Sequence, residues 1–340
     1  MTNYNAQLTT SEIAAIWTSY MNDSMNRCIL EYFLKDAEDM EIRSLVQQAY
    51  DFTNTHVTKL EQLFIKEAFP LPTGFGKEDI NLNAPRLYTD AFMLEYIGYL
   101  TRVGLLAYSG LTTTSARKDI KTLFKEGIIG VLELYDKATD ISMDKGLYVR
   151  PPYIPYPMKT DMIVSKKYFS GMNPFSSKRP LNAVEISYLH MNIRTNMIGG
   201  KLAISFAQTS AIKKVQGWML RGRDMTKKHI EIFSKILADN DIQAPLSSDI
   251  SITDSTIPPF SEKLGMFLFS ELCAIGIGNY ALAAGASQRN DLVVGYERLS
   301  LEVAQYAKDG AEIMIENEWL EQPPGTVDKE KLAKNKTKHN

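Results

Sequence analysis

The second half of this sequence repeats the first half at a nearly constant spacing, and this duplication limits the folds that the chain can adopt. At a spacing of 173 residues, His56 pairs with His229 and Pro72 pairs with Pro245. The other pairs at this spacing are Leu8 with Leu181, Glu12 with Glu185, Ile13 with Ile186, Pro85 with Pro258 and Met93 with Met266. A one-residue deletion then shortens the spacing to 172 and pairs Ser115, Arg117, Asp119, Pro151 and Pro152 with Ser287, Arg289, Asp291, Pro323 and Pro324. Because the register holds to the end of both halves, the sequence predicts one structural unit built twice.

Each copy is about 150 residues long, which is an ordinary domain size. The 340-residue chain is 44% apolar and 23% charged. Each copy therefore has enough apolar side chains for a buried core, and a chain that is mainly disordered is excluded. The formal net charge of -2 gives no overall attraction to nucleic acid, so we expect no nucleic-acid partner.

The cysteines and the N-terminal residues indicate the compartment. Cys28 and Cys273 lie far apart in the sequence and match neither a disulfide framework nor a zinc-site spacing. The first ten residues lack the basic and apolar regions of a secretory signal. These features predict a reducing, cytoplasmic location.

Apolar residues in each copy recur at three- and four-residue intervals, which is the pattern of amphipathic helices. Thr9 with Glu12, and Asn182 with Glu185, have the spacing of a capping box, so both copies should begin with a helix at the same place. The predicted helices span about 10–37, 40–68, 86–112 and 115–144 in the first copy, and about 183–208, 210–239, 258–284 and 288–320 in the second.

Prolines and serines set the predicted starts of the later helices. Pro85 and Pro258 precede apolar stretches and fit the first turn of the third helix of each copy, where a missing N–H group costs little. Ser115 and Ser287 are predicted to start the fourth helices.

The connections between the predicted helices suggest the topology. A long segment joins the second helix to the third in each copy (69–84 and 241–257), which is typical of ferritin-like bundles rather than simple meanders. The sequence thus predicts an all-α protein with two tandem ferritin-like four-helix bundles, joined by an extended Pro/Tyr-rich strap that packs along a bundle. The predicted boundaries are 8–150 for the first bundle, 151–180 for the strap, 181–325 for the second bundle and 326–340 for a basic flexible tail.

These features resemble a known family. The Pro-Pro pair after each fourth helix and the S-x-R-x-D opening at Ser115 and Ser287 are similar to those of duplicated ferritin-like proteins of unknown function from sporulating bacilli, sometimes labelled spore-coat-like. The resemblance covers roughly residues 8–325. It implies the ferritin-like fold and a link to sporulation, and it carries no catalytic residues over to this chain.

A ferritin-like di-metal site needs a Glu on each of two helices and a Glu-x-x-His on each of the other two. The histidines of this chain are His56, His190, His229 and His339, and none has a glutamate three residues before it. The twins His56 and His229 are the natural candidates for ligands of a single metal. The alternative, which we favour, is that both are core histidines with hydrogen-bonded ring nitrogens.

Glu95 and Glu271 are isolated acids in the apolar stretches of the two third helices. At the spacing of 173, Glu95 corresponds to Leu268, so the two acids lie one turn apart and are not equivalent. A metal site inherited by both copies should keep its position. We therefore expect structural roles for these acids, with Arg102 or a tyrosine hydroxyl as a partner, and we predict no metal and no other cofactor.

Arg117 with Asp119, and Arg289 with Asp291, form the most distinctive polar motif that both copies share. Two residues apart on a helix, the members of a pair point to different faces. We therefore expect each to contact another helix or the strap, in a structural role. The sequence contains no phosphate-binding, dinucleotide-binding or serine-hydrolase motif.

The segment from Leu264 to Ala286 is long and apolar enough to cross a bilayer. Ser270, Glu271 and Asn279 lie in its middle, where polar groups are costly in hydrocarbon. We therefore predict a central helix of a packed bundle and no membrane span.

Two functions of different kinds fit the sequence. The first is a non-enzymatic structural or assembly component, with 15 Met and 17 Tyr available for self-association or for contacts with other structural proteins. The alternative is a metal-dependent ferritin-like oxidoreductase, or a metal-binding protein with an atypical site. The missing Glu-x-x-His pair argues against this alternative.

Overall fold

The computed structural model describes residues 6–172, 178–246 and 251–336, and four long helices build each copy. In the first copy they are α1 (Thr10–Asp36), α2 (Met40–Lys66), α3 (Asp90–Thr114) and α4 (Lys118–Asp144), and in the second α5 (Ala183–Thr209), α6 (Lys213–Ala238), α7 (Glu262–Ala286) and α8 (Asn290–Glu316). Short helices lie outside the bundles: η1 (Lys77–Asp79), η2 (Lys166–Phe169) and α9 (Lys329–Lys336). The prediction of an all-α chain with two tandem four-helix bundles is confirmed, and the described residues form no strand beyond two isolated bridges.

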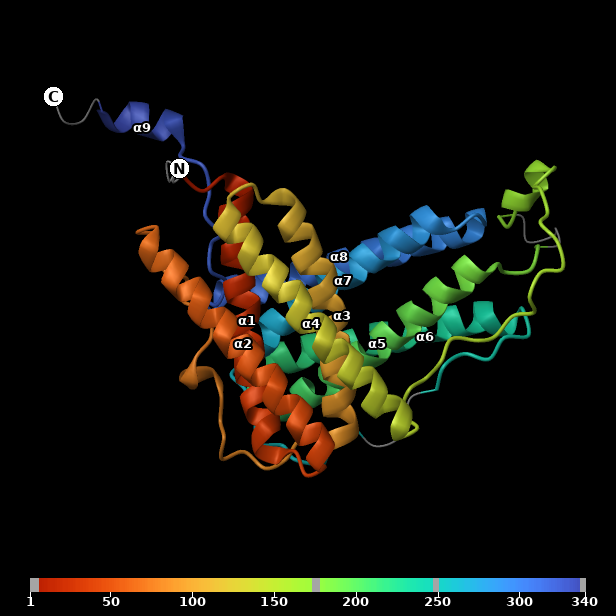
Figure 1. The fold of residues 1–340 in the computed structure, drawn as a ribbon, viewed down its shortest axis with the longest axis horizontal. Coiled ribbons are helices and arrows are strands. Elements are labelled where there is room, and N and C mark those ends of the chain that lie inside the picture. The colour runs from red at the N-terminus through yellow and green to blue at the C-terminus, as the bar shows by residue number, and fades with distance from the viewer. Residues whose placement is uncertain (1–5, 173–177, 247–250, 337–340) are drawn as a thin grey trace.

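Both bundles have the same packing order. In the first bundle, α1 contacts α2 and α3, and α4 contacts the same two helices from the other side. The second bundle repeats this order, with α5 and α8 each contacting α6 and α7. The helices of the first bundle (red to yellow in Figure 1) cross those of the second (green to blue), and α5 and α7 enter the contact between them. One apolar cluster runs through both bundles without a break.

The two crossover segments, 67–89 and 239–261, pair with each other. Ile80 forms an isolated antiparallel bridge with Phe260, and Tyr88 forms one with Ile252. Ile252 follows Ile80 by 172 positions and Phe260 follows Tyr88 by 172 positions, so the two bridges are related by the internal repeat. The one-residue deletion therefore lies before Ile80.

This register corrects two of the predicted pairs. Pro85 with Pro258 and Met93 with Met266 match at 173 but are one residue out of structural register, because the deletion precedes them. Pro85 also does not lie in a first helical turn. It stays in the crossover, where its carbonyl accepts a hydrogen bond from Tyr32 Oη at 2.6 Å.

The third helices begin instead after two hydroxyl caps. Thr89 caps α3 and Ser261 caps α7, and each side chain accepts a hydrogen bond from the backbone N–H three residues later. The predicted starts of the fourth helices are likewise corrected. Ser115 and Ser287 end α3 and α7, and their hydroxyls each donate to the carbonyl four residues earlier at 2.7 Å.

Both predicted capping boxes are present, and each glutamate does more than cap its helix. Glu12 is fully buried, and its Oε2 accepts the Thr9 N–H at 2.8 Å. Its Oε1 accepts the N–H groups of Ala116 at 2.9 Å and Arg117 at 2.7 Å, in the turn between α3 and α4. Glu185 makes the equivalent bonds to the turn before α8. In each bundle, one carboxylate thus connects the start of the first helix to the loop between the third and fourth helices.

We expect Glu12→Gln to lower the free energy of unfolding by about 1–3 kcal/mol at about pH 7, since the amide has one acceptor oxygen where the carboxylate has two. Burial raises the pKa of Glu12, but its hydrogen bonds outweigh this and lower the pKa to about 2. The stabilisation is therefore complete above the unfolded pKa of about 4.3 and is lost as the pH falls toward 2.

Urea unfolding of both proteins at several pH values between about 7 and 2 measures this. The difference between them should shrink as the solution becomes acidic, whereas the exposed control variant Glu133→Gln should match the wild type throughout. A difference that does not change with pH would contradict the assigned role of the carboxylate.

The strap differs from its prediction. Its apolar side chains do not pack along a bundle, and five of them are 84% to 99% exposed: Tyr153, Tyr156, Met158, Met162 and Val164. Figure 1 shows this segment running outside the bundles from the end of α4 toward the far end of the second bundle. Its proline-rich sequence lacks the regular apolar spacing that would fit a helical surface.

The C-terminal segment also differs from its prediction. Where a flexible tail was predicted, the structure has the helix α9, and residues 322–334 are exposed. Residues 337–340 lie outside the described part of the chain.

In the described ranges, α7 is the one helix long and apolar enough to cross a membrane, and here it packs against α5 and α8.

Candidate functional site

The twinned arginine–aspartate motif forms a salt bridge within itself. Arg117 Nε and Nη2 donate to the two carboxylate oxygens of Asp119, both at 2.8 Å. Nη2 also donates to Glu67 at the end of α2, at 2.7 Å. Arg117 holds the pKa of Asp119 well below its usual range. The prediction that the members of a pair point apart was wrong, because Arg117 is the residue before α4 and has an extended backbone, so helical spacing does not apply to it.

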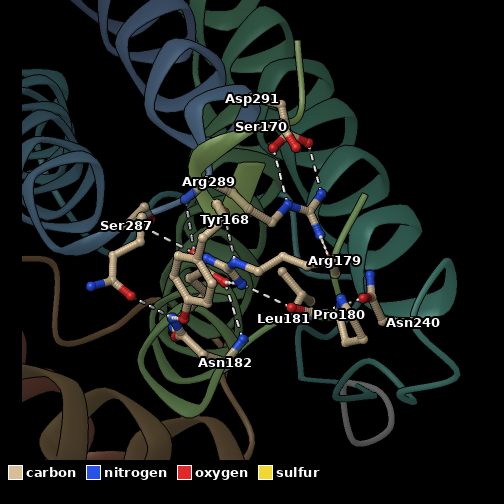
Figure 2. Close-up of polar contacts among 12 residues, drawn as sticks. Tyr168, Ser170, Arg179, Pro180, Leu181, Asn182, Asn240, Ser287, Arg289 and Asp291 are labelled. Atoms are coloured by element: carbon tan, nitrogen blue, oxygen red, sulfur yellow. Dashed lines mark hydrogen bonds and ion pairs between the residues drawn. The ribbon is translucent and has the colours of Figure 1, made fainter. Parts of the chain in front are cut away.

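The second copy repeats this arrangement and adds the strap to it (Figure 2). Arg289 Nε and Nη2 donate to Asp291 at 3.0 and 2.7 Å, and Nη1 donates to the carbonyl of Arg179 at 3.2 Å. Arg179 in turn pairs with both oxygens of Glu185 and lies over the ring of Tyr168 at 4.0 Å. These motifs therefore hold helix ends and the end of the strap together, and they leave no open site.

The twinned histidines lie in equivalent places inside the two bundles. His56 Nδ1 is 2.6 Å from Asp23 Oδ2, and Tyr108 Oη donates to Asp23 Oδ1 at 3.2 Å. Asp23 comes from α1, His56 from α2 and Tyr108 from α3. His56 is 3% exposed and is therefore a core histidine, as expected. Its Nδ1 is hydrogen-bonded, but its Nε2 makes no hydrogen bond in the described part of the chain, so the expectation that both ring nitrogens are bonded was wrong.

In the second bundle, Asn196 replaces Asp23 and Tyr280 replaces Tyr108. His229 Nδ1 is 2.8 Å from Tyr280 Oη, which also accepts the amide of Asn196 at 2.8 Å. Burial lowers the pKa of His229, although Glu302 at 3.5 Å opposes this. The Nδ1 of the second histidine therefore has a tyrosine hydroxyl as its partner, whereas the Nδ1 of the first has a carboxylate.

The four residues considered as metal ligands do not come together. Glu95 Oε2 pairs with Lys201 at 2.6 Å and so joins the two bundles, rather than using the expected Arg102 or a tyrosine. His56 and His229 belong to different bundles, and Glu271 lies on α7. Across residues 6–172, 178–246 and 251–336, no three His, Cys, Asp or Glu side chains form a group that could hold a metal ion. These residues do not fit a di-metal centre.

A cavity of about 240 Å³ lies inside the first bundle, beside Asp23 and Tyr108. All four helices of that bundle line it, and α7 of the second bundle supplies Leu268, Glu271 and Leu272 to its wall. Most of the wall is apolar. The cavity is therefore a site that both copies build together.

Aromatic side chains fill the corresponding region of the second bundle. Trp218 stacks on Tyr306 with ring centroids 4.4 Å apart, and Phe269 meets Trp218 edge to face at 5.5 Å. Gly222 makes room for Tyr306, because a Cβ at this position would meet its hydroxyl. The residues of the first copy at these positions are Leu45 for Trp218, Ala49 for Gly222, Ile97 for Phe269 and Leu134 for Tyr306. Leu45, Ile97 and Leu134 are smaller than their counterparts and leave space in the first bundle, whereas Ala49 is slightly larger than Gly222.

Sequence reasoning missed Asp23, Tyr108 and the cavity wall of α1. Ser19, Asn22, Asp23 and Asn26 recur at three- and four-residue steps and all line the cavity. A polar stripe of this kind among the apolar residues of α1 was the available signal. The search for Glu-x-x-His could not find it, since His56, the histidine that contacts Asp23, comes from another helix.

The two histidine networks should respond differently to loss of their tyrosine hydroxyl. Tyr280→Phe leaves His229 Nδ1 and one amide hydrogen of Asn196 without partners in a buried place, and should cost about 1–3 kcal/mol. Tyr108→Phe leaves Asp23 with its bond to His56, and should cost about 0.5–1.5 kcal/mol. Urea unfolding of the two variants and the wild type measures both losses. Equal losses, or a larger loss for Tyr108→Phe, would contradict the described networks.

Comparison with known proteins gives a family for this chain. A search of curated proteins finds no match. Among solved structures, the crystal structure of a putative spore coat protein from Bacillus halodurans C-125 is similar, with a TM-score of 0.41 and 18% sequence identity over 45% of this chain and 98% of that chain. The sequence model of DUF3231, described as a protein of unknown function, matches residues 1–159 and again residues 169–332. Because these two matches cover both copies, the chain belongs to the duplicated members of the DUF3231 family.

Proposed function

We propose that this protein binds a small, mostly apolar molecule in the cavity of the first bundle. The observation that carries the proposal is the cavity itself, with a volume of about 240 Å³. An engineered apolar cavity of about 150 Å³ is large enough to bind benzene. The space in the first bundle therefore suits a ligand somewhat larger than one aromatic ring.

The position of the cavity supports binding from solution. Among the lining residues, Thr18 on α1 and Ala107 on α3 are exposed, and they mark a mouth between these two helices. The two helices touch less along their length than their counterparts α5 and α7 do. A ligand can therefore enter between α1 and α3.

The chemistry of the chain supports binding over catalysis. The sequence has no Glu-x-x-His pair, and the arginine–aspartate motifs are engaged in holding helix ends. The cavity wall contains carboxylates, amides and hydroxyls but no cysteine or histidine. We therefore propose a binding protein without an enzymatic step.

Filling the cavity with the side chains of the second copy tests this proposal. In the double variant Ala49→Gly with Leu134→Tyr, the tyrosine should occupy the space as Tyr306 does in the second bundle. NMR titration with toluene should show saturable binding to the wild type and at least about tenfold weaker binding to the variant.

Ala107→Phe provides a second way to test the same site. It narrows the mouth at an exposed position, so the protein should fold normally while toluene binding weakens. Circular dichroism and thermal unfolding check that both variants are folded. If toluene does not bind the wild type, or binds all three proteins equally, the cavity is not a binding site.

The exposed strap favours a second function. We propose that the strap also drives self-association, which fits a cytoplasmic structural or assembly component linked, as the family resemblance implies, to the sporulating cell. Its support is the row of apolar side chains from Tyr153 to Val164 that this chain leaves in water.

Sedimentation tests the role of the strap directly. The wild type should sediment as an oligomer at micromolar concentration, and the variant with Tyr153, Tyr156, Met158 and Met162 all replaced by Ser should sediment as a monomer. Leu301→Ser removes an exposed apolar side chain from α8 and serves as the control. A monomeric wild type, or a variant that keeps its oligomeric state, would remove the support for assembly through the strap.

A further inference from the structure

Several polar groups of the cavity lie together on one wall. Ser19, Asn22, Asp23 and Asn26 form one face of α1, and Glu271 on α7 lies against this face through Asn22. Among the described residues, the lining includes these two acids and no Lys, Arg or His. The wall therefore contains carboxyl groups and no cationic side chain.

Glu271 is the acid that the fold leaves without a charged partner. In the described ranges no Lys, Arg or His lies within ion-pair distance of its carboxylate, whereas Asp23 is paired with His56. Burial raises the pKa of Glu271, and the amide of Asn22 lowers it in part. A half-buried carboxylate facing an apolar space is costly unless something compensates its charge.

Two buried hydroxyl groups in the same wall are also without partners. Tyr99 Oη and Ser19 Oγ each make no hydrogen bond in the described part of the chain, although their residues are only 6% and 4% exposed. Buried polar atoms are normally hydrogen-bonded, and those that are not mark places where another molecule supplies the bond. Both residues line the cavity, although their two oxygens are almost completely covered by neighbouring atoms.

Aromatic rings complete the site. Phe52 lines the cavity from α2, and Tyr96, Tyr99 and Tyr108 line it from α3. Aromatic faces attract organic cations as well as apolar groups. The wall therefore combines the two features that recognise an ammonium group attached to a hydrocarbon body, an unpaired carboxylate and aromatic surface.

We propose that the ligand of this cavity is an organic monocation, a small amine with an apolar body, whose ammonium group is held by Glu271 while its body fills the space between the aromatic and aliphatic side chains. The proposal rests on the binding function proposed above and adds the class of ligand. Because Glu271 comes from α7, the second bundle supplies the charge and the first supplies the space.

Three probes with one body and different charges test the ligand class. Isothermal titration of the full chain with phenylbutylamine, phenylbutanol and phenylbutyrate compares a cation, a neutral molecule and an anion. We expect the amine to bind about tenfold or more tightly than the alcohol, because a hydrogen bond to a charged group is stronger than one between neutral groups. The carboxylate should bind most weakly, since it meets Glu271 and Asp23.

Matched variants identify the group that selects charge. Glu271→Gln keeps the size of the side chain and should abolish the preference for the amine over the alcohol, because it weakens binding of the amine most. Glu133→Gln removes the same charge from an exposed position next to the lining residue Leu134 and should keep the preference. The double variant that fills the cavity should bind none of the three probes.

The outcomes separate this proposal from the one on which it rests. If the alcohol or the carboxylate binds as tightly as the amine, or if Glu271→Gln keeps the preference, the ligand class is wrong while toluene binding still supports a binding site. If none of the probes binds the wild type and toluene also fails, both proposals are wrong. If the amine binds the filled variant as tightly as it binds the wild type, its binding site lies outside the cavity. This outcome also overturns the assignment.

Discussion

The main-chain pairing of the two crossover segments determines how the bundles meet, and the cavity depends on it. Ser261, the cap of α7, donates its N–H to the carbonyl of Asp79 at 3.0 Å and its hydroxyl to the carboxylate of Asp79 at 2.6 Å. Asp79 belongs to the crossover of the first bundle. The start of α7 is therefore attached to the first copy, and this places Glu271 two to three turns later against α1. Without this attachment the cavity would lose one of its walls.

Much of the helical framework could be predicted because local chemistry determines it. The capping boxes at Thr9 and Asn182 placed the starts of both copies, and they are seen in the structure. The sequence prediction started the third helices too early, because a proline such as Pro85 is compatible with the first turn of a helix and also with an extended crossover segment. The error in the repeat register had a related cause. Chance identities such as Met93 with Met266 concealed a deletion that only the paired crossovers reveal.

The candidate site was harder to predict, because its residues come from five helices and its polar atoms face inward. Sequence reasoning singled out Glu271 but did not assign it to a cavity. Asp23 lies two residues after Met21 and two before Met25, so its apolar neighbours hide it in the pattern of a core helix. The space itself arises where Leu45, Ile97 and Leu134 take the places of a tryptophan, a phenylalanine and a tyrosine, and a difference in side-chain volume leaves no periodic signal.

The crossover bridges have a two-fold relation that bears on how this architecture can be assembled. Ile80 pairs with Phe260, and the repeat equivalents of these two residues, Ile252 and Tyr88, form the other bridge. Exchanging the two copies therefore converts one bridge into the other, as in a symmetric dimer. One unit on its own thus carries both sides of the contact and could associate with a duplicate of itself. Fusion into one polypeptide makes that encounter intramolecular and effectively permanent. Once the two units no longer have to be identical, one can stay densely packed and supply rigidity while the other accumulates the substitutions that open its interior.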